Sequence, residues 1–492
     1  MNEQLTRSGS PSCDVAIIGA GPAGLAATEV MRPYGLSVTV IDEQPRPGGQ
    51  ILRQPPRTFT VDNWLPAKLY GPAKSVLRSM GDATEVSWRL GSTVLGIMPP
   101  SPYSVSTSSG VGHSLWIQGP GGWEVLHARA VLIATGCYER PLPFPGWTLP
   151  GVMGAGGIQG FVKSQQFVPG NRFVFAGSHP LQLVVADQLV QAGADVAAVI
   201  FTQQRHHALD LLRYPLVILE HTRKLAEAGR ILLRLRRAGV PVKFGSAIVQ
   251  VSGKNAVERV TIAPLVSGGR VDLAGIETID CDRVGVCHGF LVCSELARQA
   301  GARVSLKLNE GGWLVEHDSW FESSVSNVFV AGEVTAMAGA DAALEKGRVA
   351  GIGILRALQQ MDSNQARRLA RSPRRRLRGI NRFAKALNRL AQPGNIAAVT
   401  TEDTIICRCE SITLGELRSQ LQENPHIVSA DAAKLATRAG MGMCQGRFCS
   451  ENVARVVAEQ RGMMLADVGT FHVQAPIKPT MIGRLQQAVV EE

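Results

Sequence analysis

A glycine-rich turn near the start of the chain limits the possible folds more than any other feature. It lies between the buried-strand pattern of residues 14–18 and an apolar helical pattern that runs to about residue 32, and it reads Gly19-Ala-Gly21-Pro22-Ala23-Gly24. Gly19 allows a tight turn, Gly21 lets the backbone approach a pyrophosphate, and Gly24 lets helix and strand pack closely. The N-terminus of the helix also stabilises the negative charge of a bound phosphate. The sequence therefore predicts a parallel α/β domain that binds a dinucleotide.

An acidic residue follows the next strand pattern. Residues 38–41 form this pattern, and Asp42 ends it a little over twenty residues after Gly19, where a carboxylate can bind the ribose hydroxyls. Glu43 is the alternative, but Asp42 is favoured because it lies at the strand end. A glycine-rich turn without a ligand is the competing interpretation. The sequence has all the required parts in order: strand, glycines, helix, second strand and acid. This order favours a bound dinucleotide.

Four cysteines near the C-terminus predict a metal centre. They form one C-x-C pair and one C-x₄-C pair, and they are Cys407, Cys409, Cys444 and Cys449. Thiolates hold the irons of a [2Fe-2S] cluster, and the glycines beside the second pair let the backbone curl around it. A structural zinc site is the alternative, because zinc also accepts four thiolates. Zinc sites usually space a pair by two to four residues, so the tight C-x-C pair favours iron–sulfur.

A second dinucleotide domain is expected from about residue 171, but its fingerprint is broken. After the strand pattern of residues 172–176, His179 stands where the second glycine belongs and Gln182 where the third belongs. The strand pattern of residues 196–200 ends without an acid. We therefore expect weak or no NAD(P) binding. A catalytic acid or base role for His179 is the alternative, although nothing in the sequence orients its ring.

Composition is that of a large redox protein with several cores. The chain has 492 residues, of which 45% are hydrophobic, and this length favours about three domains. It contains no run of eighteen apolar residues, and residues 1–5 lack a signal-peptide pattern, so a soluble cytoplasmic protein is expected. Nine cysteines, an odd number, argue against a disulfide framework. No pair of cysteines resembles a redox-active disulfide.

Much of the net charge of +11 lies in residues 367–389. A nucleic-acid site is not favoured, because no aromatic stacking residues are interleaved with the basic ones. Peripheral contact with an anionic membrane stays possible for such a segment. Apolar residues recur through the basic segment at helical spacing, and they are Leu377, Ile380, Phe383, Leu387 and Leu390. They predict a basic helix whose apolar stripe packs on the rest of the chain or on a partner.

Several further segments carry a family resemblance. They include Pro47-Gly48-Gly49-Gln50, Ala134-Thr135-Gly136 and Gly332-Glu333. With the first glycine turn and the cysteines, the chain resembles the FAD-containing subunit of opine oxidases and the related subunits of D-hydroxyproline dehydrogenase, hydrogen cyanide synthase and dye-linked proline dehydrogenase. The cysteine segment resembles the domain named after bacterioferritin-associated ferredoxin. His179 is the main departure.

The resemblance implies FAD and a [2Fe-2S] cluster as cofactors, with NAD(P) not expected. The residues that would contact FAD are Gly19, Gly21, Pro22, Ala23, Gly24, Asp42, Glu43, Gly49, Gln50, Thr135, Gly136, Gly332 and Glu333. Metal ligands would be the four cysteines. It also implies an α/β fold with two Rossmann-like domains of the two-domain flavoprotein type, plus a small, mainly α C-terminal [2Fe-2S] domain. We expect a discontinuous FAD domain at 12–165 and 285–360, a degenerate NAD(P)-like domain at 170–280, a basic helical linker at 361–399, the cluster domain at 400–460 and a C-terminal arm at 461–492.

No catalytic residue is evident, so substrate chemistry is expected on another chain. In the resembling enzymes, an amino-acid-oxidase-like FAD-containing β subunit oxidises the C–N bond of an opine or a D-amino or imino acid, of the octopine, nopaline or D-hydroxyproline type. This chain would then transfer electrons through its cluster and FAD to an acceptor such as a quinone. Glycine oxidation in a hydrogen cyanide synthase, a stand-alone NAD(P)H-dependent flavoprotein reductase and a non-enzymatic cluster sensor are the alternatives.

Overall fold

A computed structural model describes residues 11–56, 58–59, 61, 67–81, 83–98, 112–206, 210, 213–266, 269–393, 399–481 and 483. The expectations for residues 1–5, for the end of the basic linker at 394–398 and for the end of the C-terminal arm lie outside these residues. The chain divides into two compact units. One unit comprises residues 1–138, 291–385 and 473–492, and the other comprises residues 139–290 and 386–472.

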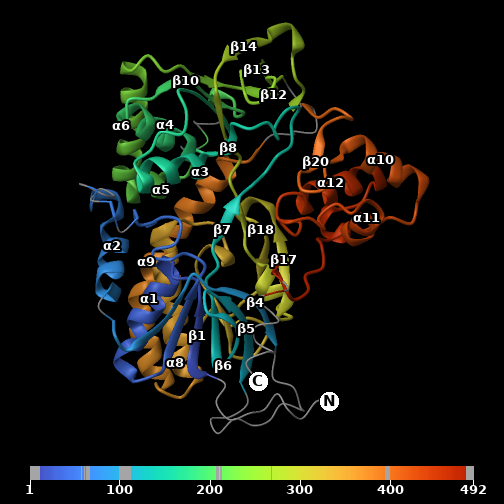
Figure 1. Ribbon diagram of the computed structural model, residues 1–492. Helices are drawn as coiled ribbons and strands as arrows, with labels where there is room; N and C mark the ends of the chain where they lie inside the picture. Colours follow the sequence, from blue (N-terminus) through green and yellow to red (C-terminus); the bar gives the residue numbers. More distant parts are fainter. Residues whose placement is uncertain are drawn as a thin grey trace. The chain divides into compact units, whose positions relative to one another are not determined.

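The first unit is built on a seven-stranded sheet (Figure 1). Its strands are β1 (Ser12–Ile18), β2 (Val38–Asp42), β3 (Val86–Leu90), β4 (Thr93–Met98), β5 (His113–Gly119), β6 (Gly122–Ile133) and β19 (Val328–Val330). The order is β3-β2-β1-β6-β5-β4, and β19 also pairs with β6. The neighbours β3, β2, β1 and β6 pair in parallel, and β19 also pairs in parallel with β6. β5 is antiparallel to β6, and β4 is antiparallel to β5. The glycine-rich turn thus follows a central strand in the parallel part of the sheet, as the sequence predicts.

Helices and short strands complete this unit. They are α1 (Pro22–Met31), α2 (Ala67–Gly81), α7 (Glu295–Gln299), α8 (Ala340–Ala357), most of α9 (Ser363–Leu390), β17 (Val304–Lys307) and β18 (Gly312–Val315). β7 (Cys137–Glu139) and β16 (Phe290–Val292) lie where the chain passes from one unit to the other. The long helix α9 is basic, and its apolar stripe contributes Leu377 and Ile380 to the core formed with α1 and α8.

The second unit contains a smaller parallel sheet and the cysteine-bearing module. The sheet order is β11-β10-β9-β15-β8, formed by β8 (Val152–Gly154), β9 (Arg172–Gly177), β10 (Asp195–Phe201), β11 (Val242–Phe244) and β15 (Arg283–Cys287). An antiparallel sheet of β12 (Ser246–Ser252), β13 (Arg259–Pro264) and β14 (Glu277–Asp280) adjoins it in sequence. The helices are α3 (Ala155–Gly160), α4 (Leu181–Gln191), α5 (Pro215–Glu220) and α6 (Thr222–Arg237).

The cysteine-bearing module has its own core. Its elements are β20 (Ile405–Cys407), β21 (Ile412–Thr413), α10 (Leu414–Glu423), α11 (Ala430–Thr437), α12 (Ser450–Arg461) and α13 (Leu465–Val468). Buried Leu417, Leu421, Val453 and Val457 belong to one apolar cluster of this module. The α/β fold with two Rossmann-like domains and a small, mainly α module confirms the predicted fold class.

Residues 473–481 of the C-terminal arm pack on the first unit. The backbone N–H of Ile477 donates to the Leu95 carbonyl at 2.8 Å, and Ile477 is buried. Lys478 forms an ion pair with Glu43. The described part of the arm is therefore anchored to this chain, because Ile477 enters the apolar core beside β4.

The contact between α1 and α8 depends on glycine. A methyl group at Gly347 would overlap the backbone of Ala23, because the two helices approach without a side chain between them. We expect Gly347→Ala to lower the free energy of unfolding by about 1–3 kcal/mol, as overpacking does in other cores. Thermal unfolding of the purified protein measures this change.

Gly229→Ala is the matched control. Gly229 also lies inside a helix, α6, but a methyl group there meets nothing within 4 Å. Alanine should stabilise this position slightly, because it forms helix more readily than glycine. Equal thermal midpoints for the two variants would contradict the proposed close contact.

Candidate cofactor sites

The first glycine turn is closed by direct backbone contacts. Gly19 has a φ of 108°, which favours glycine, and a methyl group there would overlap the Ala134 carbonyl. A methyl group at Gly24 would overlap the carbonyl of Gly19. Gly21 is the N-cap of α1, and no side chain caps this helix. The turn therefore places a bare helix N-terminus at the carboxyl end of β1, which suits a pyrophosphate.

Three other predicted segments meet this turn. Gly49 has a φ of 60°, and a methyl group there would lie 2.9 Å from the Cα atom of Gly21. A methyl group at Gly332 would lie 2.9 Å from the Ala23 side chain. Ala134 contacts Gly19 directly, as described above. Residues that are far apart in the sequence thus form one cradle around the turn, while Gln50 extends from it and is exposed.

Asp42 and Glu43 have different surroundings. One carboxylate oxygen of Asp42 accepts a hydrogen bond from the Ala20 N–H at 2.6 Å, and the other accepts one from the Gln44 N–H at 2.7 Å. Burial raises the pKa of Asp42, and these two N–H groups oppose that change. Glu43 is exposed and pairs with Lys478. Asp42 is therefore the carboxylate that lies beside the glycine turn.

The loop after β19 holds a second carboxylate. Glu333 accepts hydrogen bonds from the N–H groups of Ala338, at 3.1 Å, and Gly339, at 2.6 Å. The ammonium group of Lys346 donates to the carbonyls of Gly332, at 3.1 Å, and Ala336, at 2.7 Å. Burial lowers the pKa of Lys346 to about 8, and the charge of Glu333 opposes this change. Burial likewise raises the pKa of Glu333, against the charge of Lys346.

Lys346 was not among the residues predicted from the sequence. It is buried in α8 and braces the Gly332 and Ala336 carbonyls, so it fixes the loop that carries Glu333. Its charge alone did not single it out, because Glu345 and Arg348 of the same helix are also charged. Thr135 is also engaged, because its hydroxyl donates to the Cys293 carbonyl at 2.8 Å. Gly136 follows it with a φ of 77°.

The cradle fits FAD. The missing Cβ atoms leave room for a close backbone approach, and the two carboxylates provide acceptors for sugar and ribityl hydroxyls. Bound FAD would supply hydride and electron chemistry. The turn, Asp42 and Glu333 would bind and orient it.

Asp42→Asn tests the assignment of the ribose-binding carboxylate. Loss of the charge-assisted hydrogen bonds should raise the FAD dissociation constant about tenfold or more. Fluorescence titration of FAD-free protein measures this constant. Glu43→Gln is the control, since Glu43 faces solvent and Lys478; a larger loss of affinity in this variant would reverse the assignment.

The four predicted metal ligands meet in two sulfur pairs. The Cys449 thiol donates a hydrogen bond to the Cys407 sulfur, which lowers the pKa of Cys407 to about 6 and raises the pKa of Cys449. Cys444 makes the corresponding contact with Cys409, and burial together with this contact raises the pKa of Cys444. Each pair thus takes one cysteine from the β20 segment and one from the segment before α12.

Backbone amides surround these sulfurs. The Gly440 N–H donates to the Cys407 sulfur at 3.4 Å, and the Cys444 sulfur accepts from the amides of Gly446 and Phe448. Gly440 and Gly446 have φ values of 89° and 80°, and a side chain at either position would overlap the ring of Phe471. This arrangement stabilises negative charge on the sulfurs.

Two pairs of thiols suit two irons, each held by two cysteines. Cys407 and Cys449 are buried, whereas Cys409 is exposed, so one edge of the site reaches the surface of the second unit. Among the described residues, no three His, Cys, Asp or Glu side chains converge as ligands of a single metal ion. All nine cysteines are free thiols, and the other five lie outside this site.

Cys444→Ala should remove the cluster, because one iron would lose half of its protein ligands. We expect iron to fall from about two atoms per chain to a small fraction of that amount, with loss of the visible absorbance of the cluster. Iron and sulfide assays measure the result. Cys281→Ala is the control, because Cys281 is buried elsewhere and burial raises the pKa of its thiol to about 12; equal iron loss in both variants would contradict the assignment.

The second Rossmann-like domain carries side chains where the first glycine turn has bare backbone. Gln182 is fully buried, and its amide donates to the Ile200 carbonyl at 3.3 Å, so a side chain fills the place of the third glycine. The His179 ring accepts a hydrogen bond from the Leu181 N–H at 3.2 Å and packs edge-on against Phe290. Burial lowers the pKa of His179 to about 4. This histidine is neutral and held by its own turn.

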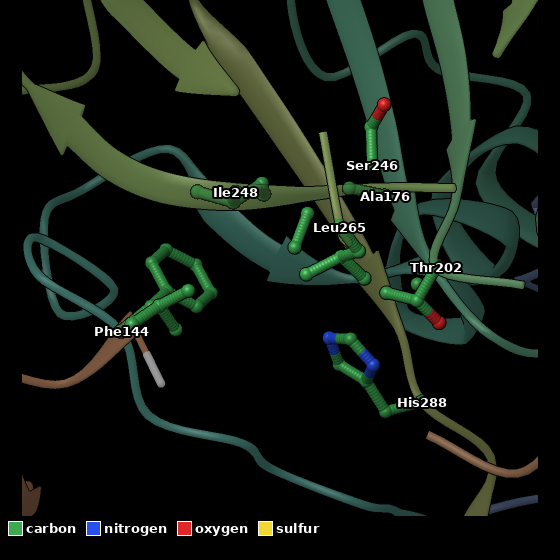
Figure 2. A pocket seen from close by; sticks show the side chains of 10 residues that line it. Phe144, Ala176, Thr202, Ser246, Ile248, Leu265 and His288 are labelled. Carbon is green, nitrogen blue, oxygen red and sulfur yellow. The ribbon is translucent and has the colours of Figure 1, made fainter. Parts of the chain in front are cut away.

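A pocket lies at the carboxyl ends of β9, β10 and β15 (Figure 2). The side chains of Thr202 and His288 face it, and burial lowers the pKa of His288 to about 4. Its other walls are mostly apolar and include Phe144, Ile248, Leu265 and Val399. Next to it, the Gln203 amide donates to the carbonyls of Ser178, at 3.0 Å, and Gln392, at 3.1 Å. Phe201 stands at the strand end that corresponds to Asp42, and Gln203, two residues later, holds the chain's own linker.

The folds and the two sites define a flavoprotein with two Rossmann-like domains and an iron–sulfur module. Comparison with known families agrees: residues 13–350 match the pyridine nucleotide-disulphide oxidoreductase family, and residues 405–459 match the BFD-like [2Fe-2S] binding domain. The chain belongs to the pyridine nucleotide-disulphide oxidoreductase family and carries a BFD-like domain. Its cofactors are FAD and a [2Fe-2S] cluster, as predicted.

Relatives align with almost the whole chain. Hydrogen cyanide synthase subunit HcnB of Pseudomonas aeruginosa is 32% identical over 488 residues, covering 96% of this chain and 98% of the relative. An opine oxidase subunit of Agrobacterium tumefaciens is 32% identical over 480 residues, covering 96% of this chain and 91% of the relative. These matches confirm the predicted family resemblance.

A solved structure has the same fold. L-proline dehydrogenase from P. horikoshii aligns with a TM-score of 0.67 and 19% identity, covering 97% of this chain and 81% of that chain. In the parts of the chain that are described, no helix is long and apolar enough to cross a membrane.

Proposed function

We propose that this chain is the electron-transfer subunit of a heteromeric dehydrogenase that oxidises the C–N bond of an opine or a D-amino or imino acid. A partner flavoprotein of the amino-acid-oxidase type takes a hydride from the substrate carbon, and the resulting imine hydrolyses. The electrons then pass as single electrons through the cysteine-held cluster. FAD bound by this chain connects that path to an acceptor such as a quinone.

The observation that carries the proposal is the presence of two redox sites without a catalytic constellation among the residues that the structure describes. The cradle at Gly19 and the four cysteines each fit a redox group, while the titratable residues around the FAD cradle are engaged in holding the backbone. The relatives from P. aeruginosa and A. tumefaciens are both named as subunits. Their names support a division of labour between two chains.

A hydrogen cyanide synthase subunit, with glycine as the substrate, is the second candidate. The similarity to HcnB favours it as much as the similarity to the opine oxidase relative favours the first, since both are 32% identical over almost the whole chain. The two candidates differ in the substrate pocket, which this proposal places on the partner. A substrate screen distinguishes them.

A stand-alone NAD(P)H reductase is less well supported. Gln182 fills the glycine position, and Phe201 stands where an acid would bind ribose. Both features reduce the room and the polar partners that a nicotinamide dinucleotide needs.

The test is copurification followed by a dye-linked assay of the complex. Opines, D-amino acids, D-hydroxyproline, proline and glycine are the substrates, and NADH and NADPH are the competing donors. We expect oxidation of one C–N substrate only when the partner flavoprotein is present, and little flavin reduction by either nicotinamide. Oxidation by this chain alone at the full rate, or rapid flavin bleaching by NADH, would overturn the proposal.

A further inference from the structure

A short segment of the second unit contacts the cysteine-bearing module, called the cluster module below, near both halves of its ligand set. One half carries Cys407 and Cys409, and the other half carries Cys444 and Cys449. We call residues 140–147, which follow β7, the bracing segment. Its first residue, Arg140, places its guanidinium 3.4 Å from the carboxylate of Glu451. Their side chains are 5% and 13% exposed, so this ion pair is largely removed from solvent. Glu451 lies two residues after the cluster ligand Cys449.

Asn452, which follows Glu451, makes a second contact with the bracing segment. The side-chain amide of Asn452 donates to the Pro141 carbonyl at 3.1 Å and to the Phe448 carbonyl at 3.2 Å. Phe448 immediately precedes Cys449. One buried amide therefore links the bracing segment to the backbone that carries a cluster ligand.

Trp147, at the far end of the bracing segment, contacts the half of the cluster module that carries Cys407 and Cys409. The indole N–H of Trp147 donates to the Ile405 carbonyl at 2.7 Å, and Trp147 is buried. Ile405 begins β20 and lies two residues before Cys407. Thus one end of the bracing segment holds the Cys444–Cys449 side and the other end holds the Cys407–Cys409 side.

The bracing segment is itself fixed to the Rossmann-like domain. The Arg140 N–H donates to the Gly289 carbonyl at 2.9 Å, and the Val251 N–H donates to the Pro145 carbonyl at 2.9 Å. Phe144 and Trp147 belong to the apolar cluster of β9, β10 and β13. A shift of either half of the module would have to break these contacts.

We propose that the bracing segment positions the two halves of the cluster ligand set and thereby tunes the cluster. Each sulfur pair combines one cysteine from each half, Cys407 with Cys449 and Cys409 with Cys444. A displacement of one half therefore changes both pairs together. Arg140, Trp147, Glu451 and Asn452 are positioning residues, because they act through the backbone of the ligands.

The inference rests on the cluster site and not on the partner or substrate of the proposed function. All its tests use the isolated full-length chain. Loss of the substrate assignment would leave them unchanged, and their failure would leave the substrate assignment untouched.

Trp147→Phe is the first variant, because it removes the hydrogen bond to Ile405 without a change of charge. In the reduced protein we expect a shifted or broadened electron paramagnetic resonance spectrum of the cluster. In cluster-free protein we expect the four cysteines to react with iodoacetamide about tenfold faster. Trp123→Phe is the control, since Trp123 lies in the other unit and its ring packs at a tilt against Trp116 of β5.

Charge variants separate positioning from simple instability. Glu451→Gln leaves the Arg140 charge unbalanced, so the reduction potential of the cluster should rise, whereas Arg140→Gln should lower it. The double variant, with both Arg140→Gln and Glu451→Gln, should have a reduction potential close to that of the wild type. Its electron paramagnetic resonance spectrum should stay altered, because the ion pair is still missing. Glu459→Gln, on the exposed face of the same helix α12, should change neither.

FAD content and thermal midpoint of each preparation establish that the chain is folded. If Trp147→Phe fails to retain a cluster, the alkylation rates of its cluster-free form and the potentials of the charge variants still decide the question. Unchanged spectra, potentials and alkylation rates in the Trp147, Arg140 and Glu451 variants would overturn the inference. Equal effects of Trp123→Phe or Glu459→Gln would do the same.

Discussion

The close approach of backbones at glycine is the constraint on which the first unit depends. Gly19 meets Ala134, Gly24 meets Gly19 and Gly347 meets Ala23, each at a distance that leaves no room for a side chain. These contacts bring β1, β6, α1 and α8 together at one point. The carboxyl end of the central strand then becomes a cradle with a bare helix N-terminus and two carboxylates. The same contacts that pack the core thus create the cofactor site.

The cluster module follows a different principle. Its core is small, and the cysteines that meet in one sulfur pair are separated by more than thirty residues of sequence. Glycines against Phe471 allow the ligand loop to curl, and amides directed at the sulfurs favour the thiolate form. External contacts through Arg140, Pro141 and Trp147 add fixed points that the module alone does not provide.

Local patterns were sufficient for much of the fold and for the expectation that the four cysteines form one site. The glycine turn, the strand that ends at Asp42 and the cysteine spacing each combine short-range geometry with a specific chemical need. Sequence alone did not reveal that Cys407 meets Cys449, because sulfur pairing depends on how two halves of a module pack. Nor did it reveal Lys346 as the brace of the Glu333 loop or Gln203 as the partner of Gln392, since both contacts join segments through tertiary packing.

The central claim is that one chain holds both a flavin and a [2Fe-2S] cluster as working redox groups. Anaerobic reductive titration of the isolated chain with dithionite, followed by absorbance and electron paramagnetic resonance, tests it most directly. We expect about three electron equivalents per chain, two for FAD and one for the cluster, together with the signal of a reduced cluster. Uptake of two equivalents without that signal, or of one equivalent without flavin bleaching, would contradict it.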